Sequence, residues 1–265
     1  MLLTVAVAAG AVATWRRNPD WQSDATLFRA ALPLSPQSPF VHFMVAATEE
    51  DSFLAEQEYR QAIRLAENDR PPAIPTLVQA CESLASMYGD RGRFVEALQF
   101  LAQARQADPA DSELDAAEGA LLLRAGRWQE AAPLLERAVN GPAASENALN
   151  ALALLEWQQR HNLERAAQLF RRALEVHSLA DDFSASLHNN LGAVYGEERL
   201  YPQAAEQFGA AVRIAPNDAE YRTNFAAALA ALGRYPDAAQ QAQLALQIAP
   251  GFPPAIQLLR QLQSR

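Results

Sequence analysis

The sequence contains no lysine, and all twenty-two of its basic residues are arginine. Thirty-one acidic residues outnumber them and give the chain a formal net charge of −9 at pH 7. A nucleic-acid-binding protein normally gathers its basic residues on one face, where they displace counterions from the phosphates. The arginines of this chain are instead scattered along the sequence. The composition therefore argues against nucleic acid as a partner.

Cysteine and the motifs of common catalytic and cofactor sites are also scarce. The single cysteine, Cys81, excludes an internal disulfide, and its place one turn before Leu84 in an apolar pattern favours a packing thiol over a nucleophile. The sequence has no glycine-rich phosphate loop, no zinc-protease motif and no paired histidine spacing. The acidic run at 49–51 lacks the alternate spacing of a calcium loop. We predict no catalytic residue, no metal site and no cofactor.

What the chain does contain is a repeat of 34 residues. Residues 187–216 align with residues 221–250 at that offset. The same frame continues upstream to residue 84, with one extra residue before one unit and four before Ala185. The aligned positions carry matching residue types: Leu191 with Phe225, Tyr201 with Tyr235, Ala204 with Ala238, and Pro216 with Pro250. A constant spacing over several units is typical of stacked repeat proteins.

Each unit predicts two antiparallel helices. Apolar residues recur at intervals of three and four, which is the period of an amphipathic helix. A glycine such as Gly92 or Gly126, or else a polar turn, ends the first helix where a left-handed residue is needed. The second helix carries alanines that allow close helix contact, and prolines such as Pro216 and Pro250 end it. We therefore predict an all-α solenoid of helix pairs.

These positions resemble the signature of the tetratricopeptide repeat (TPR) family. The resemblance covers residues 78–252 as five units and implies a right-handed superhelix of antiparallel helix pairs. Residues 16–77 contain two degenerate units and a linker-like stretch, and residues 253–265 include a helix that caps the solenoid. Terminal repeats of a solenoid need such a cap because each repeat buries its apolar face only against a neighbour.

The same resemblance implies a peptide-binding groove lined by the first helices. In several relatives an asparagine at one groove position binds extended peptide backbone, and the matching residues here are Asn190 and Asn224, 34 residues apart. An amide side chain offers both a donor and an acceptor, as a peptide bond requires. Asn189, Thr223 and Arg222 lie beside this pair and complete the predicted groove. The alternative role for the asparagines is hydrogen bonding between neighbouring repeats, and a groove for carboxyl termini would need more cations than Arg222 alone.

The N-terminal fourteen residues, MLLTVAVAAGAVAT, are almost wholly apolar and precede Trp15, Arg16 and Arg17. They lack the basic start of a signal peptide, and they are shorter than the ~20 residues of a complete membrane span. They also lack the polar stripe of an ordinary groove helix. We expect a truncated membrane span first, a signal anchor second and a cytoplasmic helix third. Residues 1–15 are thus predicted to associate the chain with a membrane.

The junction that follows is similar to the last span and first repeat of transmembrane-and-TPR membrane O-mannosyltransferases and their bacterial relatives. The residues that carry this similarity are Arg17, Asn18, Trp21, Asp24, Leu27 and Phe28, followed by Val41 and His42. It implies an extracytoplasmic, periplasmic solenoid, whereas the arginine pair favours a cytoplasmic one. We expect a scaffold that binds a peptide or partner helix and is not itself an enzyme. The alternative is a C-terminal module that presents acceptor protein to a membrane glycosyltransferase.

Overall fold

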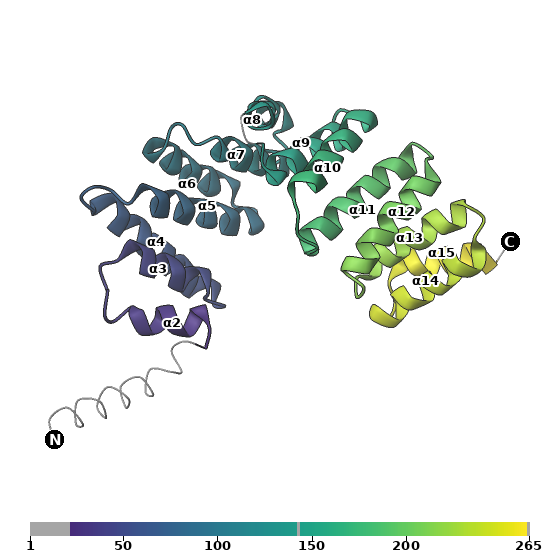
Figure 1. Ribbon diagram of the computed structural model, residues 1–265, viewed down its shortest axis with the longest axis horizontal. Helices are drawn as coiled ribbons and strands as arrows, with labels where there is room; N and C mark the ends of the chain where they lie inside the picture. The colour runs from purple at the N-terminus through teal and green to yellow at the C-terminus, as the bar shows by residue number, and fades with distance from the viewer. Residues whose placement is uncertain (1–21, 142–143, 264–265) are drawn as a thin grey trace, which may run out of the picture. The chain divides into compact units, whose positions relative to one another are not determined.

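The computed structural model describes residues 22–141 and 144–263, and these residues form fourteen α-helices and no β-strand (Figure 1). The all-α class predicted from the sequence is confirmed. The chain divides into two compact units, unit 1 at residues 1–114 and unit 2 at residues 115–265. The apolar segment at residues 1–15, predicted to meet a membrane, lies outside the described residues. Within the described ranges, no helix has both the length and the apolar character needed to cross a bilayer.

Unit 1 consists of a single helix and two helix pairs. Helix α2 packs on α3, α3 pairs with α4, and α5 pairs with α6. Asp51 caps α4 by accepting hydrogen bonds from the backbone N–H groups of Phe53 and Leu54, a common way to satisfy the first turn of a helix. The helices of unit 1 are α2 (Asp24–Ala31), α3 (Pro39–Ala47), α4 (Ser52–Asn68), α5 (Ile74–Asp90) and α6 (Phe94–Ala107).

Unit 2 continues the alternation of first and second helices. Within it, α9 pairs with α10, α11 with α12 and α13 with α14, and the first helices α11, α13 and α15 also contact one another in that order. The unit boundary falls in the first turn of α7 (Glu113–Arg124). The other helices of unit 2 are α8 (Trp128–Asn140), α9 (Glu146–Gln158), α10 (Leu163–Val176), α11 (Asp182–Glu197), α12 (Tyr201–Ile214), α13 (Ala219–Ala231), α14 (Tyr235–Ile248) and α15 (Pro253–Gln263).

The turn inside each of five helix pairs contains one residue in the left-handed conformation. Three are glycines, Gly92, Gly126 and Gly233, with φ between 72° and 77°. The other two are His161 at φ 52° and Arg199 at φ 61°. Their positions along the chain reproduce the one extra residue and the four extra residues found in the repeat frame. The predicted left-handed turn is therefore confirmed. Two repeats have a non-glycine residue in this conformation, which only glycine adopts without steric strain.

Small residues sit where the two helices of a pair come closest. The glycine that opens this contact in α11, Gly192, leaves no room for a side chain, because an added Cβ would lie 2.9 Å from the Phe208 ring. One alanine in the first half of each second helix is fully buried at equivalent repeat positions: Ala97, Ala131, Ala166, Ala204 and Ala238. The small residues thus let the backbones of the two helices in each pair come close together, as the sequence indicated.

Polar side chains near the start of α11 and α13 bond to the second helix of the same pair. The Nδ1 atom of His188 lies 2.8 Å from Oε1 of Gln207. One repeat later, Nη1 of Arg222 donates to Oε1 of Gln241 at 2.9 Å. Both residues of the second pair lie 34 positions after those of the first. The repeat therefore keeps a polar link between its two helices at this position.

The equivalent slot in α9 lacks this link. It holds Asn150, and the facing position of α10 is Leu169, which has no hydrogen-bonding side chain. The Oδ1 atom of Asn150 is buried and has no hydrogen-bond partner among the described residues. A buried polar atom without a partner lowers the free energy of unfolding. The pair α9/α10 therefore carries a destabilising contact that the pairs α11/α12 and α13/α14 do not have.

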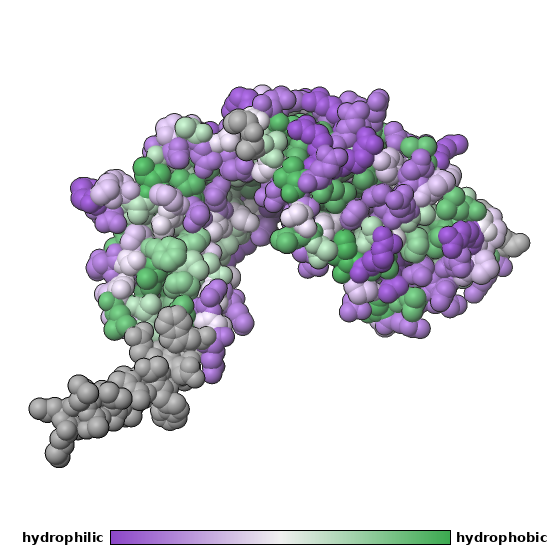
Figure 2. Space-filling model, viewed as in Figure 1, coloured by the Kyte–Doolittle hydropathy of each residue, from purple (hydrophilic) through white to green (hydrophobic). Residues whose placement is uncertain are grey.

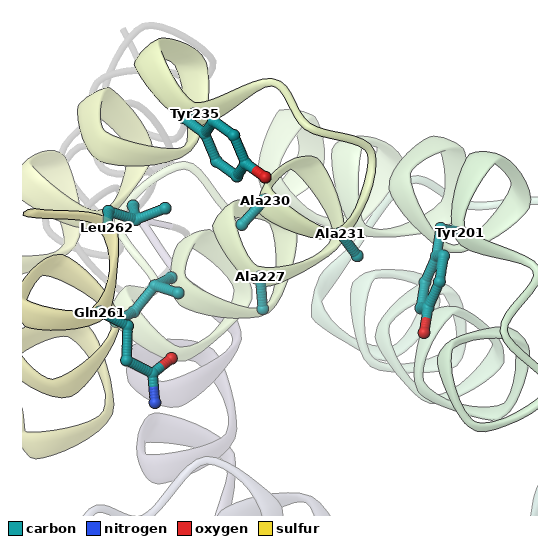
Figure 3. Close-up of a pocket in the computed structure, with 8 residues that line it drawn as sticks. Tyr201, Ala227, Ala230, Ala231, Tyr235, Gln261 and Leu262 are labelled. Carbon is teal, nitrogen blue, oxygen red and sulfur yellow. The ribbon is translucent and has the colours of Figure 1, made fainter. Parts of the chain in front are cut away.

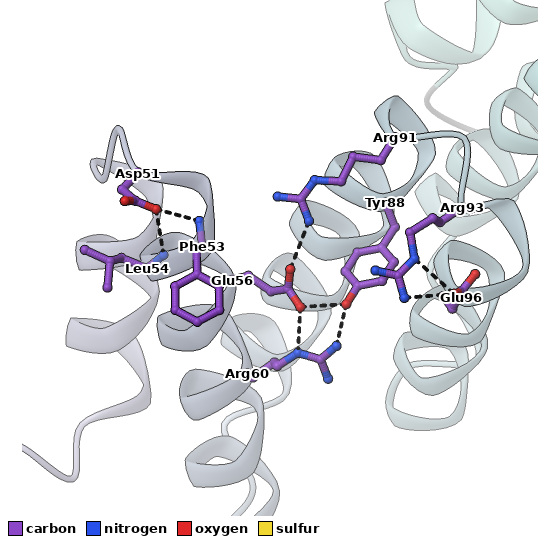
Figure 4. Close-up of polar contacts among 9 residues, drawn as sticks. All are labelled: Asp51, Phe53, Leu54, Glu56, Arg60, Tyr88, Arg91, Arg93 and Glu96. Atoms are coloured by element: carbon purple, nitrogen blue, oxygen red, sulfur yellow. Dashed lines mark hydrogen bonds and ion pairs between the residues drawn. The ribbon is translucent and has the colours of Figure 1, made fainter.

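A network of hydrogen bonds joins the two helix pairs of unit 1 (Figure 4). The hydroxyl of the buried Tyr88 accepts a hydrogen bond from Nη2 of Arg60 at 2.6 Å and donates one to Oε1 of Glu56 at 2.6 Å. Arg91 adds a bond to Oε2 of Glu56 at 3.0 Å. The guanidinium of Arg93 lies 4.4 Å from the Tyr88 ring centroid. These contacts fix α4 against α5 and leave the Tyr88 hydroxyl fully satisfied.

Unit 1 also exposes large apolar side chains. Figure 2 shows apolar residues gathered over α3 and α4 on the face in view. Leu34 is 70% exposed, Phe53 65% and Phe40 51%. Phe40 and Phe53 lie on α3 and α4, and Leu34 lies in the turn before α3. Exposed apolar side chains gathered in this way are typical of a surface that meets another apolar phase or a partner.

Candidate peptide-binding surface

The predicted groove residues lie on two adjacent first helices of unit 2. Helix α11 begins with a capping box in which Asp181 and Ser184 exchange hydrogen bonds, and Asp218 caps α13. These caps fix the register of both helices, so that Asn190 and Asn224 occupy equivalent positions one repeat apart. Both side chains are half-buried. We call the exposed side of α11, α13 and α15 the first-helix surface.

One hydrogen bond crosses between these helices at the predicted site. Nδ2 of Asn224 donates to Oδ1 of Asn189 at 3.0 Å. Asn189 is 8% exposed, so this bond satisfies a largely buried amide. The inter-repeat hydrogen bond foreseen as an alternative is therefore present, but it uses Asn189 in place of Asn190.

The remaining side-chain oxygen of Asn224 and the amide of Asn190 have no hydrogen-bond partner among the described residues. An extended backbone offers N–H donors to an acceptor such as Oδ1 and complementary groups to a complete amide. The geometry therefore leaves one acceptor on α13 and one full amide on α11.

The two flanking residues predicted for the groove are occupied by bonds within unit 2. Oγ1 of Thr223 donates to the carbonyl oxygen of Ala219 at 2.7 Å. Nε of Arg222 donates to the carbonyl oxygen of Pro216 at 2.9 Å, and its Nη1 is bonded to Gln241. The guanidinium of Arg222 thus serves the fold, which weakens the case for a carboxylate clamp at this position.

A pocket that no sequence motif marks opens further along the first-helix surface (Figure 3). It is open to solvent and has a volume of about 420 Å³, at the C-terminal end of α13 beside α15. Figure 3 shows three alanines of α13 between the rings of Tyr201 and Tyr235. The lining residues are Tyr201, Ala227, Ala230, Ala231, Tyr235, Leu258, Gln261 and Leu262. Alanines in a helical repeat are interpreted as packing residues from sequence alone, and only the three-dimensional arrangement shows that these line a hollow.

The other side chains considered as reactive or metal-binding have structural partners. Cys81 is fully buried, and burial, with the nearby carboxylates of Glu67 and Glu82, raises the pKa of its thiol to about 12. The thiol is therefore protonated near neutral pH and a poor nucleophile. In the acidic run, Glu49 pairs with Arg29 at 2.9 Å. Within the described ranges, no three histidine, cysteine or acidic residues are grouped to hold a metal ion.

A family model supports the repeat assignment. The model described as tetratricopeptide repeat matches residues 83–148, 116–182, 150–219 and 189–253. These overlapping matches together cover well over half of the chain.

A curated human relative carries the same kind of repeat. The chain is 23% identical over 170 residues to human Protein O-mannosyl-transferase TMTC1. The match covers 64% of this chain and 18% of that protein, so the chain spans less than a fifth of the length of this relative.

Solved structures show similarity in fold. The structure of the APC/C hetero-tetramer Cut9–Hcn1 matches 89% of this chain and 45% of its own, with a TM-score of 0.72 and 18% identity. The PilF protein of Pseudomonas aeruginosa matches 72% of this chain and 85% of its own, with a TM-score of 0.65 and 21% identity. YrrB, described as a TPR protein with an unusual peptide-binding site, matches 76% of this chain and 97% of its own, with a TM-score of 0.55 and 18% identity. At these identities the similarity concerns the fold alone.

Proposed function

The chain belongs to the tetratricopeptide repeat family, and from this premise we propose that its first-helix surface binds an extended segment of a partner protein. Repeats of this family imply a scaffold for protein interactions. The contact lies on α11 and α13, and the ligand is a peptide in extended conformation.

One observation carries this proposal. Asn190 and Asn224 lie one repeat apart on contacting helices, and together they leave a complete amide and one further side-chain oxygen without partners among the described residues. An extended segment repeats its N–H and C=O groups regularly and can meet both positions. A folded surface would need a matching pair of polar groups at the same spacing.

Panning a phage library of random dodecapeptides against the full chain tests this function. Enriched peptides should bind wild-type protein, and Asn190→Ala should weaken them several-fold, matching the ~0.5–1.5 kcal/mol of a hydrogen bond between uncharged groups. Asn140→Ala, at an exposed position at the end of the second helix α8, is the matched control and should bind as wild type does. If the enriched peptides bound Asn190→Ala as tightly as wild type, Asn190 would not contact the peptide.

We further propose that residues 1–15 tether the chain to a membrane. The apolar sequence of residues 1–14 supports this, as do the exposed Leu34, Phe40 and Phe53 in the segment that follows. The full chain should sediment with membranes, and a variant that lacks residues 1–15 should stay in the supernatant. Full-length protein in the supernatant, with Met1 retained, would contradict the tether.

The second candidate is a module that presents acceptor protein to a membrane glycosyltransferase. The similarity to TMTC1 over 64% of this chain favours it, together with Arg17, Asn18 and Trp21 at the N-terminal junction. This function requires an extracytoplasmic solenoid. An alkaline phosphatase fused after residue 265 should then be active, since that enzyme folds outside the cytoplasm. Reading the genomic frame upstream of Met1 separates the two candidates, because only a transferase requires further apolar spans there.

A further inference from the structure

We infer that the pocket between α13 and α15 selects the bound segment by receiving one large, uncharged apolar side chain. This inference rests on the proposed peptide-binding function and adds a sequence requirement to it. The pocket lies on the same first-helix surface as Asn224 and is lined by α13, α15 and the tyrosines that begin α12 and α14. The pocket therefore lies on the same surface that is proposed to bind the peptide backbone.

The lining defines the chemistry of the side chain. Alanine and leucine side chains of α13 and α15 supply its apolar walls, the rings of Tyr201 and Tyr235 flank it, and Gln261 is its amide (Figure 3). None of the described residues that line it is charged. A charged side chain entering this space would lose hydration without gaining a counter-ion. Its volume of about 420 Å³ is near the lower end of the ~300–1,000 Å³ of ligand pockets, which suits one large side chain.

The helix geometry sets the distance between this side chain and the backbone contact. Asn224, Ala227 and Ala231 are three and four residues apart, so they lie along one face of α13. The seven residues from Asn224 to Ala231 advance about 10 Å along the helix axis at ~1.5 Å per residue. An extended segment covers that distance in about three residues at ~3.3 Å each. The apolar residue should therefore lie about three positions from the residue bonded at Asn224.

The lining of the pocket differs from the equivalent residues one repeat earlier. One repeat earlier, the positions of Ala230 and Ala231 are held by Gly196 and Glu197. The carboxylate of Glu197 accepts a hydrogen bond from Nε1 of Trp157 at 2.9 Å, which places charge where α13 has a methyl group. The equivalent end of α11 therefore carries a charged side chain, and the preference for an apolar residue should arise at the end of α13.

The test uses the dodecapeptides enriched on the full chain, labelled with fluorescein and titrated by fluorescence anisotropy. The protein variants are Ala231→Phe and Ala227→Phe, which fill the pocket from two exposed positions, and Ala102→Phe, at an exposed position on α6, is the matched control. Circular dichroism confirms that each variant keeps its helical signal. The enriched peptides should share one leucine, isoleucine, methionine, phenylalanine or tryptophan, and replacing it by aspartate should weaken binding about tenfold or more.

Three results are distinguishable. Loss of about tenfold or more in affinity with either pocket variant, and none with Ala102→Phe, supports the pocket. Peptides that still depend on Asn190 but bind Ala231→Phe and Ala227→Phe as tightly as wild type overturn the pocket and leave the proposed function standing. A library that yields no peptide enriched over a blank surface overturns both.

Discussion

Nδ2 of Asn224 donates a hydrogen bond to the side-chain Oδ1 of Asn189, 3.0 Å away on the preceding first helix. The asparagine repeat is therefore asymmetric, because Asn224 has a structural bond that Asn190 lacks. We therefore expect Asn224 to contribute both to the stability of the fold and to peptide binding. Asn190 should contribute to peptide binding alone. This distinction separates two variants that sequence alone treats as equivalent.

Asn224→Ala should lower the free energy of unfolding, and Asn190→Ala should leave it unchanged. The first substitution leaves the amide of Asn189, which is 8% exposed, without its partner, at a cost of roughly 1–3 kcal/mol. Urea unfolding followed by circular dichroism measures both. Equal midpoints for Asn224→Ala and wild type would show that the bond is not maintained in solution.

The repeat architecture was predictable from the sequence because its determinants are local and periodic. Glycine, alanine and proline constrain the backbone at fixed positions, so Gly92, Ala204 and Pro216 indicate where a helix turns, closes on its partner or ends. Even the departures in spacing appear in the structure as displaced left-handed turns at His161 and Arg199. The fold class depends on such positions, and the 34-residue repeat contains them in several successive units.

The candidate site was only partly predictable, since side-chain bonds depend on distances between helices. The sequence placed Asn190 and Asn224 in one ladder, but it could not show that Asn224 would reach Asn189 or that Arg222 would be bonded to Gln241. The pocket escaped prediction for another reason. An alanine such as Ala231 has the same periodicity whether it packs against a helix or lines a hollow.

Replacing the left-handed side chains by glycine should stabilise the protein. A non-glycine residue in this conformation costs about 1–2 kcal/mol, of which the greater unfolded-state entropy of glycine cancels a part. His161→Gly and Arg199→Gly should each therefore raise the free energy of unfolding by up to about 1 kcal/mol. Gly126→Ala, at φ 75°, is the reverse test and should lower it. Thermal melting of the three variants measures the effect, and destabilisation by both glycine substitutions would mean that the side chains make compensating contacts.

Glu156→Val should be nearly neutral or stabilising, although Glu156 is only 1% exposed. Its carboxylate accepts a hydrogen bond from Arg160 at 2.6 Å and lies 3.1 Å from Arg165. Burying this charge costs solvation, and apolar replacements of buried ion pairs are often neutral or better. Both arginines keep Glu136 as a partner, at 3.3 Å and 2.7 Å.

Valine is the natural choice for this test because the equivalent position of α11 is Val194, which is fully buried. Urea unfolding should place Glu156→Val within about 1 kcal/mol of wild type or above it. A loss near the ~3–5 kcal/mol typical of a broken buried pair would show that the arginines depend on this carboxylate.

The junction between α10 and α11 should lose stability as the pH rises, because of His177. Its Nε2 lies 2.9 Å from Oδ1 of Asp181, its Nδ1 lies 3.6 Å from Oε1 of Glu146, and its ring meets Phe183 edge-on at 5.1 Å. The hydrogen bond to Asp181, and next the charges of Asp181 and Glu146, raise the pKa of His177 above its ordinary 6.5. The folded state therefore binds this proton more tightly than the unfolded state does.

The stabilisation is consequently complete below about pH 6.5 and disappears as the pH passes through the raised pKa of His177. At the acidic end, the hydrogen bond from Ser184 and then that from His177 lower the pKa of Asp181, so the partner keeps its charge. The difference in melting temperature between wild type and His177→Gln should be large near pH 6 and small near pH 9. Gln168→Ala, at an exposed position on α10, is the control: it removes no titratable group, so its difference from wild type should stay constant with pH. A His177→Gln difference that stays constant across this range would mean that the ring acts through its contact with Phe183 and that its charge contributes nothing.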